Sequence, residues 1–109
     1  MAAKQLTFTY GDTDYVLEFT RNSVRQMESN GFIAGDLENK PMTVLPDLFA
    51  GAFIAHHRFV KRKLIDEIYG KMKDKASLIE RLTVMYNDTI ESMLFDEPEE
   101  GNLEWTPSW

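Results

Sequence analysis

The stretch LTFTYGDTDYVLEF, residues 6–19, decides the fold. Aromatic and aliphatic side chains alternate with polar ones on both sides of a Gly11-Asp12-Thr13 turn, which is the pattern of a β-hairpin. The alternation gives the hairpin one apolar face, formed by Phe8, Tyr10, Tyr15, Leu17 and Phe19. Because an isolated hairpin is only marginally stable in water, we expect this face to lie on helices.

The residues that follow the hairpin predict a short helix over residues 20–30. Ser23 and Gln26 have capping-box spacing, and Asn30-Gly31 is a suitable stop. Only Val24 and Met27 would face the core. Residues 34–41 are rich in Gly, Asp, Asn and Pro, so we expect a surface loop there.

A wide apolar stripe then runs from residue 45 to residue 72. We predict that its helix begins between Thr43 and Pro46, since proline is tolerated in a first turn. The stripe predicts either one bent helix or two, with a change of direction near residues 60–63. Gly51 and Ala52 are small enough to let another element approach closely.

The last amphipathic pattern predicts a helix that starts near Ser77, where Ser77 and Glu80 have capping-box spacing, and ends near Phe95. We therefore predict an α+β fold in which an N-terminal β-hairpin packs on a small bundle of about four helices. Residues 1–95 would form a single globular domain. Residues 96–109 lack periodicity and would form a flexible acidic tail.

Composition limits the class of protein. The chain has 109 residues, with 18 acidic and 12 basic side chains, a net charge of -6 and no cysteine. The absence of cysteine excludes a disulfide scaffold, a thiolate zinc site and a cysteine nucleophile. The net negative charge disfavours a nucleic-acid binder, and no apolar run is long enough to span a membrane. We expect a protein of a reducing, intracellular compartment.

Few residues offer catalytic or metal-binding chemistry. On a helix His56 and His57 would point about 100° apart, so we expect a half-buried His56 beside an exposed His57 and not a metal site. The carboxylate pairs Asp12/Asp14, Asp66/Glu67 and Glu99/Glu100 have solvated surroundings. No phosphate-binding loop, nucleophile motif or calcium loop is present. We therefore expect no enzyme activity and no cofactor.

Charge is unevenly distributed along the chain. Residues 56–75 hold seven basic and three acidic side chains, whereas residues 96–109 hold five acidic side chains and no basic one. The two regions can pair within a chain, between copies or with a partner. The candidate partner-binding residues are Arg58, Lys61, Arg62, Leu103, Trp105 and Trp109.

Two interpretations of the tail remain open. Its tryptophans in an acidic frame are typical of a docking peptide, because aromatic side chains anchor interfaces and acids steer towards a basic surface. Alternatively the tail folds back and Trp105 completes the core. For the basic residues 58–63, the solvated side of an amphipathic helix is favoured over a nucleic-acid patch.

Several segments together resemble a known family. They are residues 15–32, the Leu48-Phe-Ala-Gly-Ala-Phe53 segment with His56-His57, the Leu82-Thr-Val-Met-Tyr86 helix and the acidic tail ending in tryptophan. This order resembles phage tail assembly chaperones of siphophages and prophages of Gram-positive bacteria. The resemblance implies a non-enzymatic protein that binds the tape-measure protein in the host cytoplasm and helps the tail tube protein polymerise. Whether a longer, frameshifted form exists stays open.

The composition is compatible with such a role. Six methionines, an aromatic hairpin and a net charge of -6 suit a holding protein that must adapt to its partner and stay in solution. We also expect a homo-oligomer, with the basic region of one copy against the acidic tail of another. The competing hypothesis is a small acidic phage regulatory or anti-host protein that binds one host protein.

Overall fold

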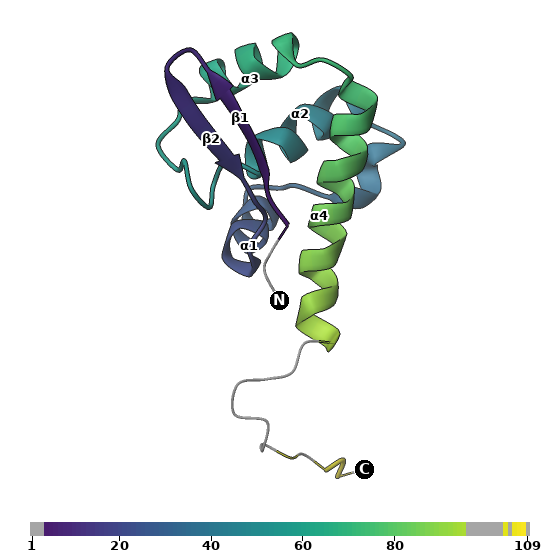
Figure 1. Cartoon of the computed structure of the whole chain (residues 1–109). Helices are drawn as coiled ribbons and strands as arrows, with labels where there is room; N and C mark the ends of the chain where they lie inside the picture. Colours follow the sequence, from purple (N-terminus) through teal and green to yellow (C-terminus); the bar gives the residue numbers. More distant parts are fainter. Residues whose placement is uncertain (1–3, 96–103, 105, 109) are drawn as a thin grey trace.

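The structure, a computed structural model, describes residues 4–95, 104 and 106–108. It confirms the predicted α+β fold, with an N-terminal antiparallel hairpin followed by helices (Figure 1). Along the described chain the elements are β1 (Leu6–Tyr10), β2 (Thr13–Leu17), α1 (Arg21–Ser29), the 3-10 helix η1 (Ala34–Leu37), α2 (Pro41–Gly51), α3 (Arg62–Lys71) and α4 (Lys75–Phe95).

The hairpin turn is one residue shorter than predicted. Tyr10 pairs with Thr13, so the loop contains only Gly11 and Asp12. Gly11 has a φ of 61°, and a glycine with positive φ at the first central position is typical of a type II′ turn. The predicted apolar face is confirmed, since Tyr15 and Leu17 are buried and the rings of Phe8 and Tyr15 stack at 5.2 Å.

The cap of α1 lies three residues earlier than the predicted one. The Thr20 side chain accepts a hydrogen bond from the Ser23 N–H at 3.0 Å, and the Ser23 hydroxyl accepts one from the Thr20 N–H. With Thr20 as the cap, Phe19 and Val24 stand at the positions of a hydrophobic staple, and both are buried. The predicted inward-facing pair, Val24 and Met27, is confirmed.

The region predicted as a loop, residues 34–41, is more structured than expected. It contains η1, and α2 begins at Pro41, before the predicted window. Pro41 is the first helical residue, where its fixed φ and missing N–H suit a helix start. The sequence pattern was ambiguous because Pro46 also fits a first turn, whereas it lies inside α2.

The apolar stripe of residues 45–72 belongs to two helices, which answers the question left open by the sequence. α2 ends at Gly51, earlier than the predicted change of direction, and α3 starts at Arg62. Residues 52–61 form a linker of turns, in which the His57 N–H donates to the Phe53 carbonyl at 2.7 Å. Phe53 is buried, but Phe59 is 93% exposed, so the helical face predicted for this part is wrong.

Asp74 starts α4 in place of the predicted Ser77. The Ser77 N–H donates to the Asp74 carboxylate at 3.3 Å, which is how an N-cap residue satisfies a free amide. Asp74 has a positive φ of 50°, as a tight joint between α3 and α4 requires. The predicted core stripe of α4 is confirmed, with Leu82, Met85 and Tyr86 buried.

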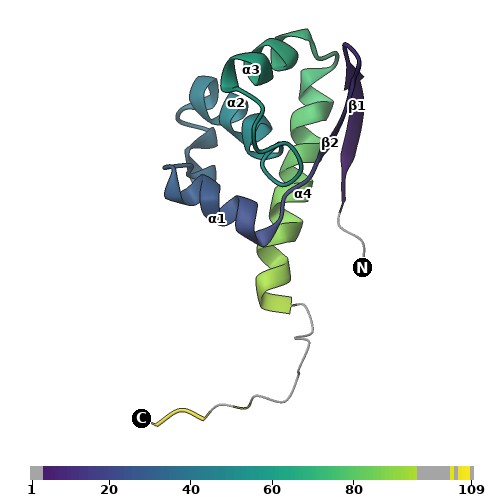
Figure 2. The same cartoon turned by 90° about the vertical axis from the view of Figure 1, so that its left-hand side faces the viewer.

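The core lies between the apolar face of the hairpin and the helices, which Figure 2 shows on one side of the two strands. Gly51 and Ala52 allow the close approach that was predicted. The Met27 side chain occupies the place that a Cβ atom of Gly51 would take, and the Ala52 carbonyl accepts a hydrogen bond from the Glu18 N–H at 3.0 Å.

The domain boundary predicted after residue 95 stays a prediction, because residues 96–103 lie outside the described residues. Most of the predicted tail lies outside the described residues. Its described members, residues 104 and 106–108, have exposed side chains and belong to no helix or strand. Its flexibility therefore stays a prediction.

Candidate functional site

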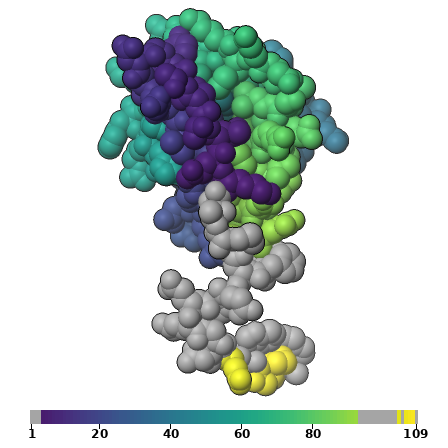
Figure 3. Space-filling model, in the orientation of Figure 1, coloured from purple at the N-terminus to yellow at the C-terminus, as the bar shows by residue number. Residues whose placement is uncertain are grey.

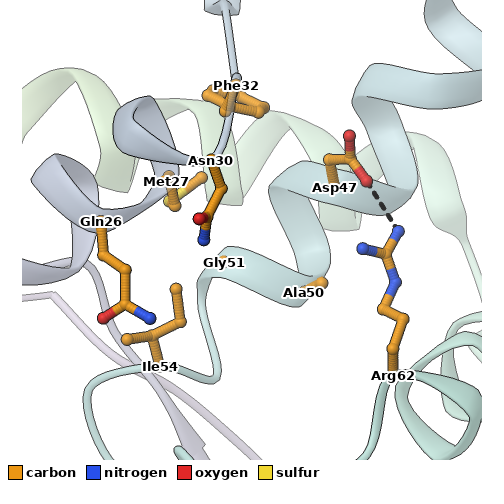
Figure 4. Close-up of a pocket in the computed structure, with 9 residues that line it drawn as sticks. All are labelled: Gln26, Met27, Asn30, Phe32, Asp47, Ala50, Gly51, Ile54 and Arg62. Atoms are coloured by element: carbon orange, nitrogen blue, oxygen red, sulfur yellow. Dashed lines mark hydrogen bonds and ion pairs between the residues drawn. The ribbon is translucent and has the colours of Figure 1, made fainter.

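A groove of about 280 Å³ opens on the surface between α1, α2 and the linker of residues 52–61 (Figure 4). It is small compared with most ligand pockets, which hold about 300–1,000 Å³. Its size suits one or two side chains of a partner better than a large cofactor. Nine residues line it, namely Gln26, Met27, Asn30, Phe32, Asp47, Ala50, Gly51, Ile54 and Arg62.

The floor of the groove is apolar because α1 and α2 meet there at a glycine. Met27 projects from α1 against Gly51 of α2, and Figure 4 shows its side chain directed at that helix. Phe32 adds an aromatic wall, and the centroid of its ring lies 5.6 Å from that of Tyr86 in α4. Ile54, from the linker, borders the open side. A flexible thioether beside fixed apolar groups can adapt to partners of different shape.

The rim of the groove is polar. Arg62 at the start of α3 donates to Asp47 of α2 at 2.7 Å and to Asp66, one turn further along α3, at 2.8 Å. Partial burial alone would lower the pKa of Arg62, but the hydrogen bonds to Asp66 and Asp47 outweigh it and raise the pKa above its usual value. The guanidinium therefore stays charged and ties α2 to α3 beside the groove.

Two amides complete the rim. Gln26 of α1 and Asn30, which caps the C-terminal end of this helix, are exposed and lie one helical turn apart. Among the nine lining residues, the only polar contact drawn in Figure 4 is the Asp47 to Arg62 ion pair. Both amide side chains can thus donate to and accept from a bound peptide backbone.

The two histidines hold the linker against β2. The His57 Nε2 atom accepts a hydrogen bond from the Val16 N–H at 2.9 Å, and the His56 Nε2 atom lies 2.7 Å from Glu18 Oε1. The predicted burial is reversed, since His57 is half-buried and His56 is exposed. The prediction was wrong because it placed both residues on a helix, whereas they lie in turns.

Burial, with a smaller contribution from His56, lowers the pKa of His57. The hydrogen bond to His56, helped by one from Gln5, lowers the pKa of Glu18. Both shifts favour the form that makes the observed contact, a neutral His57 and an ionised Glu18. The contacts of His56, His57 and Glu18 thus hold the linker in place. In the part of the chain that the structure describes, no cluster of three or more His, Cys, Asp or Glu side chains could hold a metal ion.

Three of the carboxylates that the sequence grouped in pairs have partners of their own among the described residues. Asp14 accepts from the Thr9 hydroxyl at 2.6 Å, and Glu67 accepts from the Tyr10 hydroxyl at 2.9 Å. Asp66 is paired with Arg62. The third sequence pair, Glu99/Glu100, lies outside the described residues.

The predicted partner-binding residues fall into different places. Arg62 lies at the groove, whereas Arg58 and Lys61 are exposed on the linker and do not line it. Leu103, Trp105 and Trp109 lie outside the described residues, so their role stays a prediction. Sequence reasoning missed Gln26, Asp47 and Ile54, since no spacing rule relates them, although the small Gly51 had marked the place where the helices meet.

No helix among the described residues has the length and apolarity needed to cross a membrane. A family model described as a domain of unknown function (DUF5055) matches residues 1–109. Neither a comparison with curated proteins nor one with solved structures finds a match.

Proposed function

The chain belongs to the DUF5055 family, and we propose that it is a non-enzymatic phage tail assembly chaperone. In this role it binds the tape-measure protein in the host cytoplasm and assists polymerisation of the tail tube protein. The proposal starts from the resemblance carried by residues 15–32, 48–57 and 82–86 and by the acidic tail. It involves no catalytic residue and no cofactor.

The observation that carries the proposal is the groove between α1 and α2. An apolar floor of Met27, Phe32 and Ile54 under a rim of amides and an ion pair suits an apolar side chain presented by a helix. A tape-measure protein is long and helical, so it presents such side chains many times along its length. One shallow groove on each of many copies can then shield it without a large interface on any copy.

Two further features support the proposal. Phe59 is 93% exposed on the linker and adds a second aromatic contact beside Arg58 and Lys61. The net charge of -6 would keep a complex of many copies in solution. Leu103, Trp105 and Trp109 act, in this proposal, as an additional recognition element that the neighbouring acids steer towards a basic surface.

The test is co-expression with the tape-measure protein encoded in the same gene cluster. We expect the chaperone to move the tape-measure protein from the insoluble to the soluble fraction and to co-purify with it. Ile54→Glu places a charge in the groove, and Gln26→Trp covers the groove from an exposed position. Both variants should reduce co-purification, whereas Met42→Glu, 89% exposed and outside the groove, should not.

Circular dichroism establishes that each variant is folded. Unchanged solubility of the tape-measure protein with the unaltered chain would contradict the proposed function. Capture of a single host protein by the same chain, again dependent on residues 26 and 54, would instead support the competing hypothesis of a small regulatory phage protein.

A further inference from the structure

The two outer edges of the hairpin differ in whether their backbone groups have hydrogen-bond partners. The outer edge of β2 is covered, because the Val16 N–H donates to His57 Nε2 at 2.9 Å and the Glu18 N–H donates to the Ala52 carbonyl at 3.0 Å. The linker of residues 52–61 therefore takes the place that a third strand would occupy. A covered edge of this kind cannot pair with another chain.

The outer edge of β1 has no such cover among the described residues. Tyr10 and Thr13 close a two-residue turn, so alternate pairs of the ladder, such as Phe8 with Tyr15, exchange both backbone hydrogen bonds. The residues between them, Thr7 and Thr9, direct their N–H and carbonyl groups away from β2. The described sheet contains only β1 and β2, so these groups have no strand partner in it.

β1 also lacks the features that usually protect an edge. It reads LTFTY, with no proline and no charged side chain over its five residues. Thr7 and Thr9 are exposed and β-branched, which favours the extended conformation. Figures 2 and 3 show the hairpin on the outside of the molecule, beside α4.

We propose that β1 pairs antiparallel with β1 of a second copy, so that two hairpins form one four-stranded sheet across a two-fold axis. The inference concerns self-association and does not depend on the chaperone role. Full overlap of the two strands places Phe8 on the axis and Thr7 of one copy opposite Thr9 of the other. This register matches the outward-facing backbone groups of both strands, because Thr7 and Thr9 then exchange hydrogen bonds.

Charge complementarity supports a second copy as the occupant. The same register ends with Leu6 of one copy opposite Tyr10 of the other, so Lys4 of one copy comes close to the turn that carries Asp12 of the other, once on each side of the axis. Asp12 is exposed at the tip of the turn, and Lys4 is 60% exposed at its side chain. The two-fold arrangement thus brings opposite charges together at both ends of an otherwise uncharged edge.

α4 extends the proposed interface. Lys4 forms an ion pair with Asp88 at 2.5 Å, which ties the start of β1 to this helix. Val84 lies one turn before Asp88 on the same side of α4 and is 43% exposed. β1 and α4 run in opposite directions (Figure 1), and in the proposed dimer the exposed Val84, one turn from the Lys4 to Asp88 ion pair, would add apolar area to the interface.

The test is sedimentation velocity of the full chain over a range of concentrations. We expect a monomer–dimer equilibrium that Thr7→Pro weakens by about 100-fold or more, because proline removes an outward N–H and its ring obstructs the edge. That N–H is not part of the β1 to β2 ladder, so the variant should keep its fold by circular dichroism. Thr7→Val keeps the N–H and should dimerise as the unaltered chain does.

A charge exchange tests the register. Lys4→Glu and Asp12→Lys should each weaken dimerisation by about 5-fold, and the double variant should recover most of the loss. If the dissociation constant of the double variant rises by the product of the two single increases, the proposed register is wrong. The Asp12→Lys arm leaves the Lys4 to Asp88 ion pair intact and so separates the two roles of Lys4.

A third variant distinguishes this surface from pairing between the basic linker and an acidic tail. Arg58→Glu combined with Lys61→Glu leaves β1 unaltered and should not change the dissociation constant. Loss of the dimer in that variant would overturn the proposal. So would a dimer that tolerates Thr7→Pro, or an unaltered chain that stays monomeric at its highest soluble concentration.

Discussion

At the scale of single residues, a neutral imidazole protects one edge of the hairpin. His57 can accept from the Val16 N–H only while Nε2 is unprotonated. The rings of Tyr15 and Phe53 pack against it at 5.0 and 6.2 Å between centroids, and the His56 ring, which can carry a positive charge, lies 6.4 Å away between centroids. Glu18 is already engaged by His56 and Gln5, so it does not pair with a protonated His57.

Stability should therefore fall as the solution is acidified. The pKa of His57 in the fold is below its unfolded value of about 6.5, so the unfolded chain binds more protons between these values. The contribution of His57 to stability is fully present above about pH 6.5 and is lost as the pH falls through the pKa of His57 in the folded state. The lowered pKa of Glu18 adds a second loss below about pH 4.5.

Urea unfolding at a series of pH values measures this dependence. His57→Gln offers a carbonyl acceptor that does not titrate, so the dependence between pH 6.5 and lower values should flatten. His56→Gln should keep most of the pH dependence of stability. An equally steep dependence in His57→Gln would show that another group is responsible.

The glycines should respond differently to alanine. Gly51→Ala should lower the free energy of unfolding by about 1–3 kcal/mol, because the new methyl group needs the space of the Met27 side chain. Gly70→Ala should raise it by about 0.5–1 kcal/mol, since nothing lies within 4 Å of its Cβ position in α3. Chemical denaturation of both variants provides the comparison, and equal effects would contradict the close approach at Gly51.

At the scale of elements, each helix start depends on a side chain that precedes it. Thr20 caps α1, and Asp74 supplies the acceptor for α4. In both cases the sequence offered a second polar residue three positions later, and the competing pattern gave the wrong cap. Tertiary packing decides between them, because Phe19 enters the core and leaves Thr20 at the boundary.

The caps can be distinguished by substitution. Thr20→Ala should lower the free energy of unfolding by about 1 kcal/mol, because it leaves the N–H of the buried Ser23 without its acceptor. Ser77→Ala should change stability by less than about 0.5 kcal/mol, since Ser77 contributes its backbone N–H and not its side chain to the cap. Thermal melting of both variants tests this, and the reverse order of effects would restore the cap predicted from sequence.

At the scale of the whole molecule, the buried hydrophobic side chains of the described residues all lie between Tyr15 and Tyr86. The described part of the core is thus built from the hairpin, α1, α2, α3 and α4. That the tail serves recognition and contributes little to folding stays a prediction.

Truncation after Phe95 should accordingly leave the melting temperature within a few degrees, which corresponds to under about 1 kcal/mol for a domain of this size. The same truncation should weaken binding to a tape-measure fragment, because it removes Leu103, Trp105 and Trp109. If it unfolds the domain, Trp105 belongs to the core and the tail is not a docking peptide.

The sequence by itself determined the elements whose signals are local. The alternation of residues 6–19 predicted the hairpin and its buried face, and the stripes through Val24 and Met27 and through Leu82 and Met85 predicted the inward sides of α1 and α4. Each signal depends on residues at most a few positions apart, so periodicity alone is sufficient.

Only the tertiary structure decided where α2 ends and which residues form the groove. α2 ends at Gly51 because the following carbonyl of Ala52 pairs with Glu18, and the linker continues to His57, which pairs with Val16. These partners are more than 30 positions apart, and local propensity contains no information about such contacts. The groove likewise joins α1 to Arg62, and only packing brings them together.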